Sequence, residues 1–337
     1  QKGLADVIKQ ELHNPWIRNS VIALIFSAII IGNASYEAGN IGGATLGMEA
    51  LFGLSYSKFY PSILGLSAFL LLYFGNYKAL EKVFIFLVLI MSLSFIMTAV
   101  LTQPNLWQLI KGLFVPSIPE GGILTIIALV GTTVVPYNLF LHAALVSEKW
   151  KSEKDLKFAK RDTLIAIILG GLVSISIIIS AAAIKSTEVK NVLDMAKALE
   201  PLYGSAALYF MGIGLLAAGI TSAITAPLAA AYVANSCFGW KAEFKDAKFR
   251  AIWIMILVLG VVFLSFGIKP IEIIKFAQIT NGLLLPIIAI FLLWVVNRVG
   301  VMGKYKNSLL QNCIGLAIIL LSILLGVKSI LTVLGIF

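Results

Sequence analysis

Charged residues are scarce in this chain of 337 residues, and their scarcity indicates its class. Only 12% of the residues are Asp, Glu, Lys or Arg, whereas 60% are hydrophobic. A soluble domain carries far more charge on its surface and has no need for so much apolar sequence. The composition therefore predicts an all-α polytopic membrane protein, whose apolar segments cross the bilayer as helices.

Residues that carry common enzyme chemistry are also few. The only two cysteines, Cys237 and Cys313, lie far apart in apolar surroundings, and the connections hold no Cys/His cluster, carboxylate pair or phosphate loop. The glycines Gly39, Gly42 and Gly43 fit close helix packing better than nucleotide binding. We therefore expect neither an enzyme nor a bound cofactor.

Nine apolar segments reach the length of a bilayer crossing. They are residues 19–48, 60–77, 80–102, 120–148, 161–184, 204–236, 249–268, 270–297 and 307–335. The connections are short, which predicts a single transmembrane domain over residues 1–337, with residues 1–18 as a cytoplasmic connection. Three segments exceed the length that a bilayer requires, so their helices are either tilted or interrupted.

The placement of Lys and Arg predicts the orientation. With a cytoplasmic N-terminus, 18 of the 26 basic residues lie at the cytoplasmic ends of the segments. This bias follows the positive-inside rule and explains the net charge of +10 without a nucleic-acid partner. The expected location is the cell membrane, with lipid as partner, and nine crossings put Phe337 outside.

Polar residues inside the apolar segments are costly in lipid and indicate function. Glu37 and Asn40 lie one helical turn apart in the first segment, and Gln278 lies in the eighth. In the fourth segment, "GTTVVPYNLFLHA" places Pro136 in the middle of a crossing, where proline removes a backbone donor. A helix broken at Pro136 beside other polar groups is typical of transporters that bind substrate near the bilayer midplane.

These segments resemble the Nramp (natural resistance-associated macrophage protein) family of divalent-metal transporters. "LVGTTVVPYNLFLHAALVSEKW" is similar to the family's broken sixth helix, and "GLLAAGITSAITAPLAAAYV" to its eighth. "FAQITNGLLLPIIAIFLL" resembles the tenth helix, and "ASYEAGNIGGATLGMEALFG" the third. The resemblance implies a LeuT-like inverted-repeat fold with nine helices, the third to the eleventh of the family, and secondary transport of divalent metal cations.

The tetrapeptide "EAGN" at 37–40 superficially resembles the metal-binding Asp-Pro-Gly-Asn motif of the family's first helix. Only about 20 residues separate it from the segment that resembles the fourth helix, too few for two intervening crossings. The segment is therefore interpreted as the third helix, and the first two are expected to be missing from this chain.

The resemblance implies three metal-site positions. The sixth helix of the family offers the metal a backbone carbonyl, which matches Thr132, and a methionine sulfur, which matches Val135; Gln278 matches a polar residue near the metal. Valine has no donor atom, so the preference for soft transition metals over Mg²⁺ is expected to weaken, giving a carrier of the Mg²⁺/Mn²⁺ type. Alternatively, Val135 packs beside a relocated or lost site, and Gln278 makes an interhelical hydrogen bond.

The resemblance also implies a proton or aqueous pathway, which this chain retains only in part. Glu37 and His142 match family residues, whereas Asn40 replaces an acid and Tyr137 a histidine. Because tyrosine does not exchange protons near neutral pH as histidine does, proton coupling is expected to be weak or absent. Glu37 could instead be a buried structural charge, and His142 could serve only a backbone hydrogen bond.

Two other functions stay open. A non-transporting, receptor-like relative is compatible with the substituted motif positions, and a carrier of another solute could use the same fold. Metal uptake by liposomes that contain the complete protein would separate these possibilities from metal transport.

Overall fold

The computed structural model describes residues 4–74, 78–115, 117, 120, 122–133, 135–150, 152–184, 191–240, 243–267 and 269–333. These residues form helices and no strand, as the composition predicts. Seven helical stretches are long and apolar enough to cross a membrane, and the first begins at Pro15. The prediction of an all-α polytopic membrane protein is therefore confirmed for this part of the chain.

Eight of the nine predicted segments each hold one long helix in the described residues. These helices are α2 (Pro15–Phe52), α3 (Tyr60–Phe74), α4 (Lys78–Leu101), α8 (Leu156–Ala182), α11 (Ala207–Phe238), α12 (Ala247–Ser265), α13 (Pro270–Val296) and α15 (Leu309–Val333). Helix α2 starts four residues before its predicted beginning at residue 19, inside the expected connection. The cause is local: the Asn14 side chain accepts from the N–H of Trp16 and Ile17, and Pro15 occupies the first helical position.

The remaining segment, 120–148, forms two helices, α6 (Ile123–Thr133) and α7 (Pro136–Lys149). By contrast, α2 and α11 are continuous over 38 and 32 residues, although α11 contains Pro227. Interruption therefore explains the length of segment 120–148. The long segments 19–48 and 204–236 each form one uninterrupted helix.

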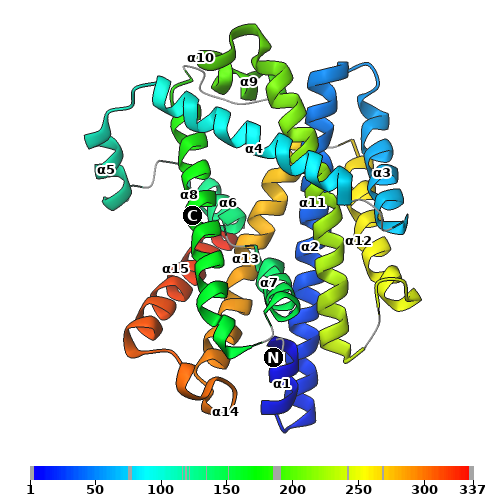
Figure 1. The fold of residues 1–337 in the computed structure, drawn as a ribbon, viewed down its shortest axis with the longest axis vertical. Coiled ribbons are helices and arrows are strands. Elements are labelled where there is room, and N and C mark those ends of the chain that lie inside the picture. Colours follow the sequence, from blue (N-terminus) through cyan, green and yellow to red (C-terminus); the bar gives the residue numbers. More distant parts are fainter. Residues whose placement is uncertain are drawn as a thin grey trace.

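Short helices cover the ends of the bundle. They are α1 (Leu4–Glu11), α5 (Leu106–Phe114), α9 (Val192–Ala196), α10 (Glu200–Tyr203) and α14 (Val299–Met302). Helix α1 packs under α2, α11 and α13, so part of the expected connection of residues 1–18 is a helix docked on the bundle (Figure 1). Single 3₁₀ turns such as Ser57–Phe59 join several of the helices.

Helix α2 is the centre of the bundle and packs on α11, α12 and α13. In Figure 1, α2 and α11 run side by side over most of their length. They approach closely because small residues face each other: a Cβ on Gly219 would lie 2.6 Å from the Cβ of Ala44, and one on Gly47 would lie 2.6 Å from the backbone nitrogen of Leu216. Such small-residue contacts replace the hydrophobic driving force that helices lack in lipid. They fix which residues of α2 face its neighbours.

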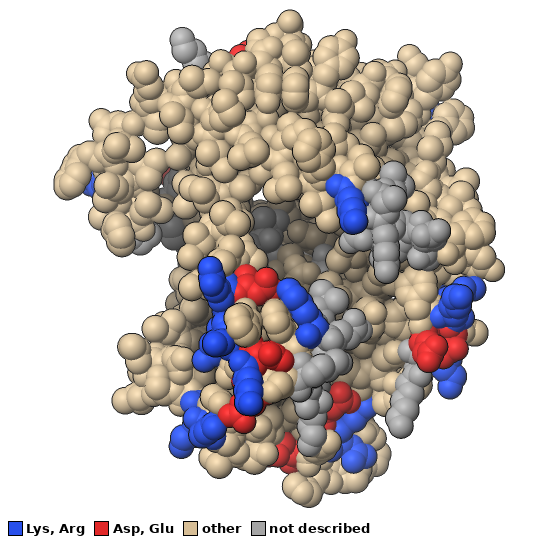
Figure 2. Space-filling model, in the orientation of Figure 1, with Lys and Arg blue, Asp and Glu red and all other residues tan. Residues whose placement is uncertain are grey.

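The face shown in Figure 2 is largely apolar, and most of its charges lie at one end. Large hydrophobic side chains of α8, such as Leu164, Ile167 and Ile168, are exposed. Figure 2 shows most Lys, Arg, Asp and Glu of this face in the lower half of the molecule, below a broad uncharged region. This distribution suits a protein whose middle contacts lipid tails. The side of the membrane on which each terminus lies stays a prediction.

Candidate functional site: the helix break and the polar face of α2

The chain leaves helical geometry between α6 and α7. Helix α6 ends at Thr133, Val135 has extended dihedral angles (φ −79°, ψ 123°), and α7 begins at Pro136. In a continuous helix, the carbonyl of Thr132 would accept from the N–H of residue 136, but proline has none. The sequence thus leaves the Thr132 carbonyl without its helical donor at the point where the helix stops.

Val135 fills the break with an apolar side chain. It is 4% exposed and belongs to a buried cluster with Ile29 of α2, Ala226 of α11 and Ile288 of α13. The break therefore faces the three central helices. The side chains of Thr132, Pro136 and Tyr137 lie outside the described residues, so their expected roles stay predictions.

Glu37 and Asn40 form a buried polar pair on α2. Glu37 is 0% exposed and Asn40 is 9% exposed, and the Asn40 amide donates to Oε2 of Glu37 over 3.2 Å. Gly260 of α12 makes room for this pair, because a Cβ there would lie 2.6 Å from Cγ of Glu37. Oε1 of Glu37 has no hydrogen-bond partner among the described residues. The structure brings these two predicted pathway residues together, and their role stays a prediction.

Asn33 belongs to the same polar face but is not a predicted site residue. It is fully buried one turn before Glu37, and its amide donates over 3.1 Å to the carbonyl of Ala226 in α11. Its Oδ1 has no partner among the described residues. The spacing of four residues from Glu37 is the signal that could have identified it.

Gln278 lies at another level of the bundle than Val135. It is half-buried on α13 and follows Ala277, whose Cβ would lie 3.4 Å from a Cβ on Gly39. Gly39 is ten residues beyond Ile29, which is about 15 Å along the helix axis. The described contacts therefore place Gln278 near the level of Glu37 and Asn40.

His142 faces α8. Its Nε2 lies 3.3 Å from Oγ1 of Thr163, and both residues line a pocket of about 390 Å³ together with Lys160. The hydrogen bond is to a side chain, whereas the sequence left open a bond to backbone. No described contact joins His142 to Glu37, so the structure does not show the two retained pathway residues as neighbours.

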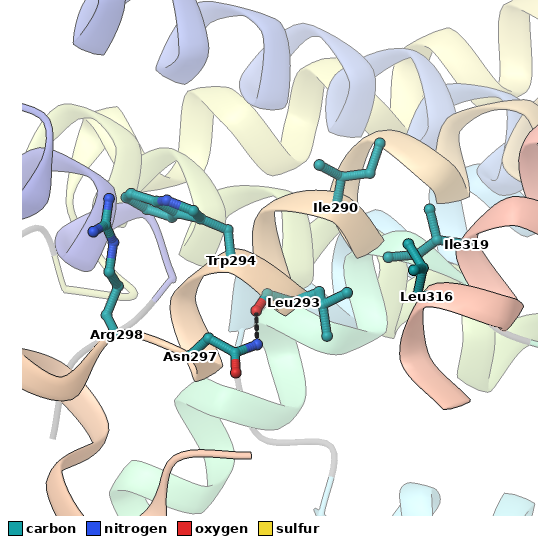
Figure 3. Close-up of a pocket in the computed structure, with 7 residues that line it drawn as sticks. All are labelled: Ile290, Leu293, Trp294, Asn297, Arg298, Leu316 and Ile319. Atoms are coloured by element: carbon teal, nitrogen blue, oxygen red, sulfur yellow. Dashed lines mark hydrogen bonds between the residues drawn. The ribbon is translucent and has the colours of Figure 1, made fainter. Parts of the chain in front are cut away.

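A separate pocket of about 460 Å³ lies between α13 and α15 (Figure 3). Its wall is mainly apolar, with Ile290 and Leu293 facing Leu316 and Ile319. At its polar end the Arg298 guanidinium stacks on Trp294, 4.5 Å from the ring centre. This pocket offers a cation few oxygen ligands, so the break and the polar face of α2 form the better candidate site. Among the described residues, no group of three or more His, Cys, Asp or Glu side chains could hold a metal ion.

The sequence matches one family along nearly its whole length. The family described as "Natural resistance-associated macrophage protein-like" matches residues 1–332. Proteins named divalent metal cation transporter MntH are similar: that of Yersinia pestis is 28% identical over 242 residues, covering 68% of this chain and 56% of that protein. The protein of the same name from Vibrio campbellii is 26% identical over 341 residues, covering 98% and 78%. The chain thus spans little more than half of the Yersinia relative.

Solved structures share the fold. A mutant of the Eremococcus coleocola manganese transporter superposes with a TM-score of 0.75 at 18% identity, covering 98% of this chain and 74% of that one. The same transporter in complex with an aromatic bis-isothiourea compound gives a TM-score of 0.76 at 19% identity. The predicted LeuT-like arrangement of helices is therefore confirmed.

Proposed function

Because the chain belongs to the Nramp family, we propose that it acts in a secondary transporter that carries divalent metal cations across a membrane. The observation that carries this proposal is the break between α6 and α7. A carbonyl freed by Pro136 is a hard oxygen ligand, and discontinuous helices in transporters supply such carbonyls to cations near the midplane. The similar proteins named divalent metal cation transporter support the choice of cargo.

The cargo is proposed to be of the Mg²⁺/Mn²⁺ type. Val135 contributes only carbon atoms where the family offers a thioether, and it is packed among other apolar side chains. A carbonyl oxygen such as that of Thr132 suits hard cations that keep part of their hydration shell. Selection for soft metals then loses its main ligand.

Proton coupling is proposed to be weak or absent. Glu37 is the one acid on the polar face of α2, with amides at Asn33 and Asn40 on either side. A relay requires hydrogen-bond reach from each titrating group to the next, and His142 contacts Thr163 on α8 instead. The cation would then move down its electrochemical gradient, with the N-terminus of this chain in the cytoplasm of a cell-membrane protein.

A receptor-like relative that binds without transporting is the second candidate. The burial of Val135 in the apolar cluster favours it, because a packed break moves less readily than a hydrated one. A carrier of another solute on the same fold is the third.

Pro136→Ala tests the role of the break. Alanine restores the N–H that could bond the Thr132 carbonyl, so the helix can continue and uptake of Mg²⁺ or Mn²⁺ into liposomes should fall sharply. Pro15→Ala is the matched control, because Pro15 also occupies the first position of a helix, far from the break. Binding of metal without uptake by the complete wild-type protein would favour a receptor. Equal uptake by both variants would contradict the role of the freed carbonyl.

A further inference from the structure

A pocket of about 490 Å³ lies near the N-terminal end of α2, between α1, α2 and the C-terminal end of α11. Its lining divides into an apolar part and a basic part. Ile22, Ala23, Phe26 and Phe238 make up the apolar part, with Cys237 beside them, and Lys9, Arg18, Asn19 and Ser27 make up the polar part. Neither the expected metal site nor the expected proton pathway includes any of these residues.

The apolar part has the shape of a strip along about one turn of α2. Ile22 and Phe26 are four residues apart, which corresponds to about 6 Å along the helix. The strip ends at an aromatic pair, in which the rings of Phe26 and Phe238 meet edge to face at 4.7 Å. A strip of this kind accommodates part of a hydrocarbon chain.

The basic part carries two cations with unused donors. Lys9 donates to the carbonyl of Ser236 over 2.5 Å, which leaves two of its three N–H bonds unused by any described residue. Nε of Arg18 bonds Oδ1 of Asn19 at 3.4 Å, and the terminal guanidinium nitrogens have no partner within the described ranges. No residue that lines the pocket is acidic, and Asp6 is the acidic group near Cys237.

The pocket in Figure 3 also has a basic residue, but there its charge is paired. There Arg298 stacks on Trp294, and its Nε lies 3.7 Å from a carboxylate oxygen of Glu11, so its charge is already compensated. Lys9 and Arg18 have no such ion pair among the described residues. An anion is therefore favoured at the pocket of α1, α2 and α11.

Aromatic residues around this pocket indicate the level of lipid headgroups. Trp16, in the first turn of α2, is 84% exposed. The ring of Trp240 stacks on that of Phe238, with 4.8 Å between the ring centres. The ammonium group of Lys248 lies over the Trp240 ring, 5.5 Å from its centre. Tryptophans beside basic side chains at helix ends are typical of the membrane–water interface.

We infer that this pocket binds one phospholipid with an anionic headgroup. Its phosphate oxygens accept hydrogen bonds from Lys9 and Arg18, and the upper part of an acyl chain lies along Ile22, Ala23 and Phe26. The occupant is a lipid rather than free phosphate, because the basic end continues directly into an apolar strip that phosphate alone leaves uncovered. The inference does not depend on metal transport.

Native mass spectrometry of the complete protein, released from nanodiscs of mixed phosphatidylglycerol and phosphatidylcholine, tests this inference. The wild-type protein should retain one phosphatidylglycerol per chain, and Lys9→Gln/Arg18→Gln should retain it about tenfold less. Lys154→Gln/Lys245→Gln removes the same charge from exposed positions and should retain the lipid as the wild type does. Arg18→Gln alone, which leaves the contact of Lys9 with Ser236 intact, should lie between wild type and double variant.

Three results would overturn the inference. The first is equal retention by the wild type and the double variant. The second is equal retention of phosphatidylcholine, which would show that the headgroup charge does not matter. The third is complete displacement of the lipid by millimolar inorganic phosphate, which would identify a plain anion site.

Discussion

Helices α2 and α11 approach each other so closely at Gly219 that an added methyl group there should destabilise the protein. A Cβ on Gly219 would lie 2.6 Å from both Cβ and the backbone nitrogen of Ala44, and 2.7 Å from the carbonyl oxygen of Asn40. Ordinary contacts begin at 3.4 Å, so Gly219→Ala forces the two helices apart by 0.8 Å, the difference between 3.4 and 2.6 Å. Because backbone atoms cannot rotate away as side chains can, the whole contact must shift.

Overpacking of this kind costs about 1–3 kcal/mol. At about 2 °C per kcal/mol for a chain of this size, the midpoint of thermal unfolding should fall by about 2–6 °C. Fluorescence-detected size-exclusion chromatography after heating in detergent measures this midpoint. The matched control is Gly43→Ala, on α2, where a Cβ would meet nothing within 4 Å. This control should keep or raise the midpoint, because alanine favours a helix by about 1 kcal/mol over glycine.

A Gly219→Ala protein as stable as Gly43→Ala would refute the packing of α2 against α11. It would then follow that the polar face of α2, including Asn40, does not lie where the structure places it. The level of Gln278 and Val135 relative to that face would lose its support as well.

Two further predictions concern selectivity and the contact of α13 with α15. Val135→Met supplies a thioether at the break and should raise uptake of Cd²⁺ relative to Mg²⁺, measured by competition in liposomes. A wild-type protein that already prefers Cd²⁺ strongly over Mg²⁺ would contradict the proposed selectivity for hard ions. Asn297 and Asn312 exchange amide hydrogen bonds of 2.7 Å in both directions. Asn297→Leu should therefore destabilise the protein by about 1–3 kcal/mol, and adding Asn312→Leu should recover part of this loss in thermal melts; additive losses would mean that the pair does not couple.

Much of this fold could be predicted because hydrocarbon imposes simple rules on a sequence. The segment 270–297 and helix α13 agree to within one residue, since apolar length and the Pro270 start both mark the crossing. The end of α6 could be predicted because Pro136 removes the N–H that would bond the Thr132 carbonyl. Helix α5 was not predicted, because nine residues are too few for a length criterion and only their amphipathic pattern distinguishes them from a loop.

The candidate site could be predicted less well, since it depends on which neighbour each side chain faces. Spacing correctly indicated that Glu37 and Asn40 share a face, but it did not show that Asn33 bonds α11 or that His142 faces α8. These contacts are set by helix rotation, which small residues such as Gly260 determine. A sequence pattern shows that these small residues are present, but not which helix packs against them.

We propose that this chain acts in a divalent-cation carrier with little proton coupling. The most direct test reconstitutes the complete protein in liposomes that contain both a metal-sensitive and a pH-sensitive dye, under an inside-negative potential. Such a potential contributes about 2.3 kcal/mol per charge per 100 mV, so it drives cation entry strongly. We predict entry of Mn²⁺ and Mg²⁺ with little acidification, and only a modest change in Glu37→Gln. Metal-driven acidification that disappears in Glu37→Gln would contradict this account, because it would show that the buried acid of α2 still carries the proton.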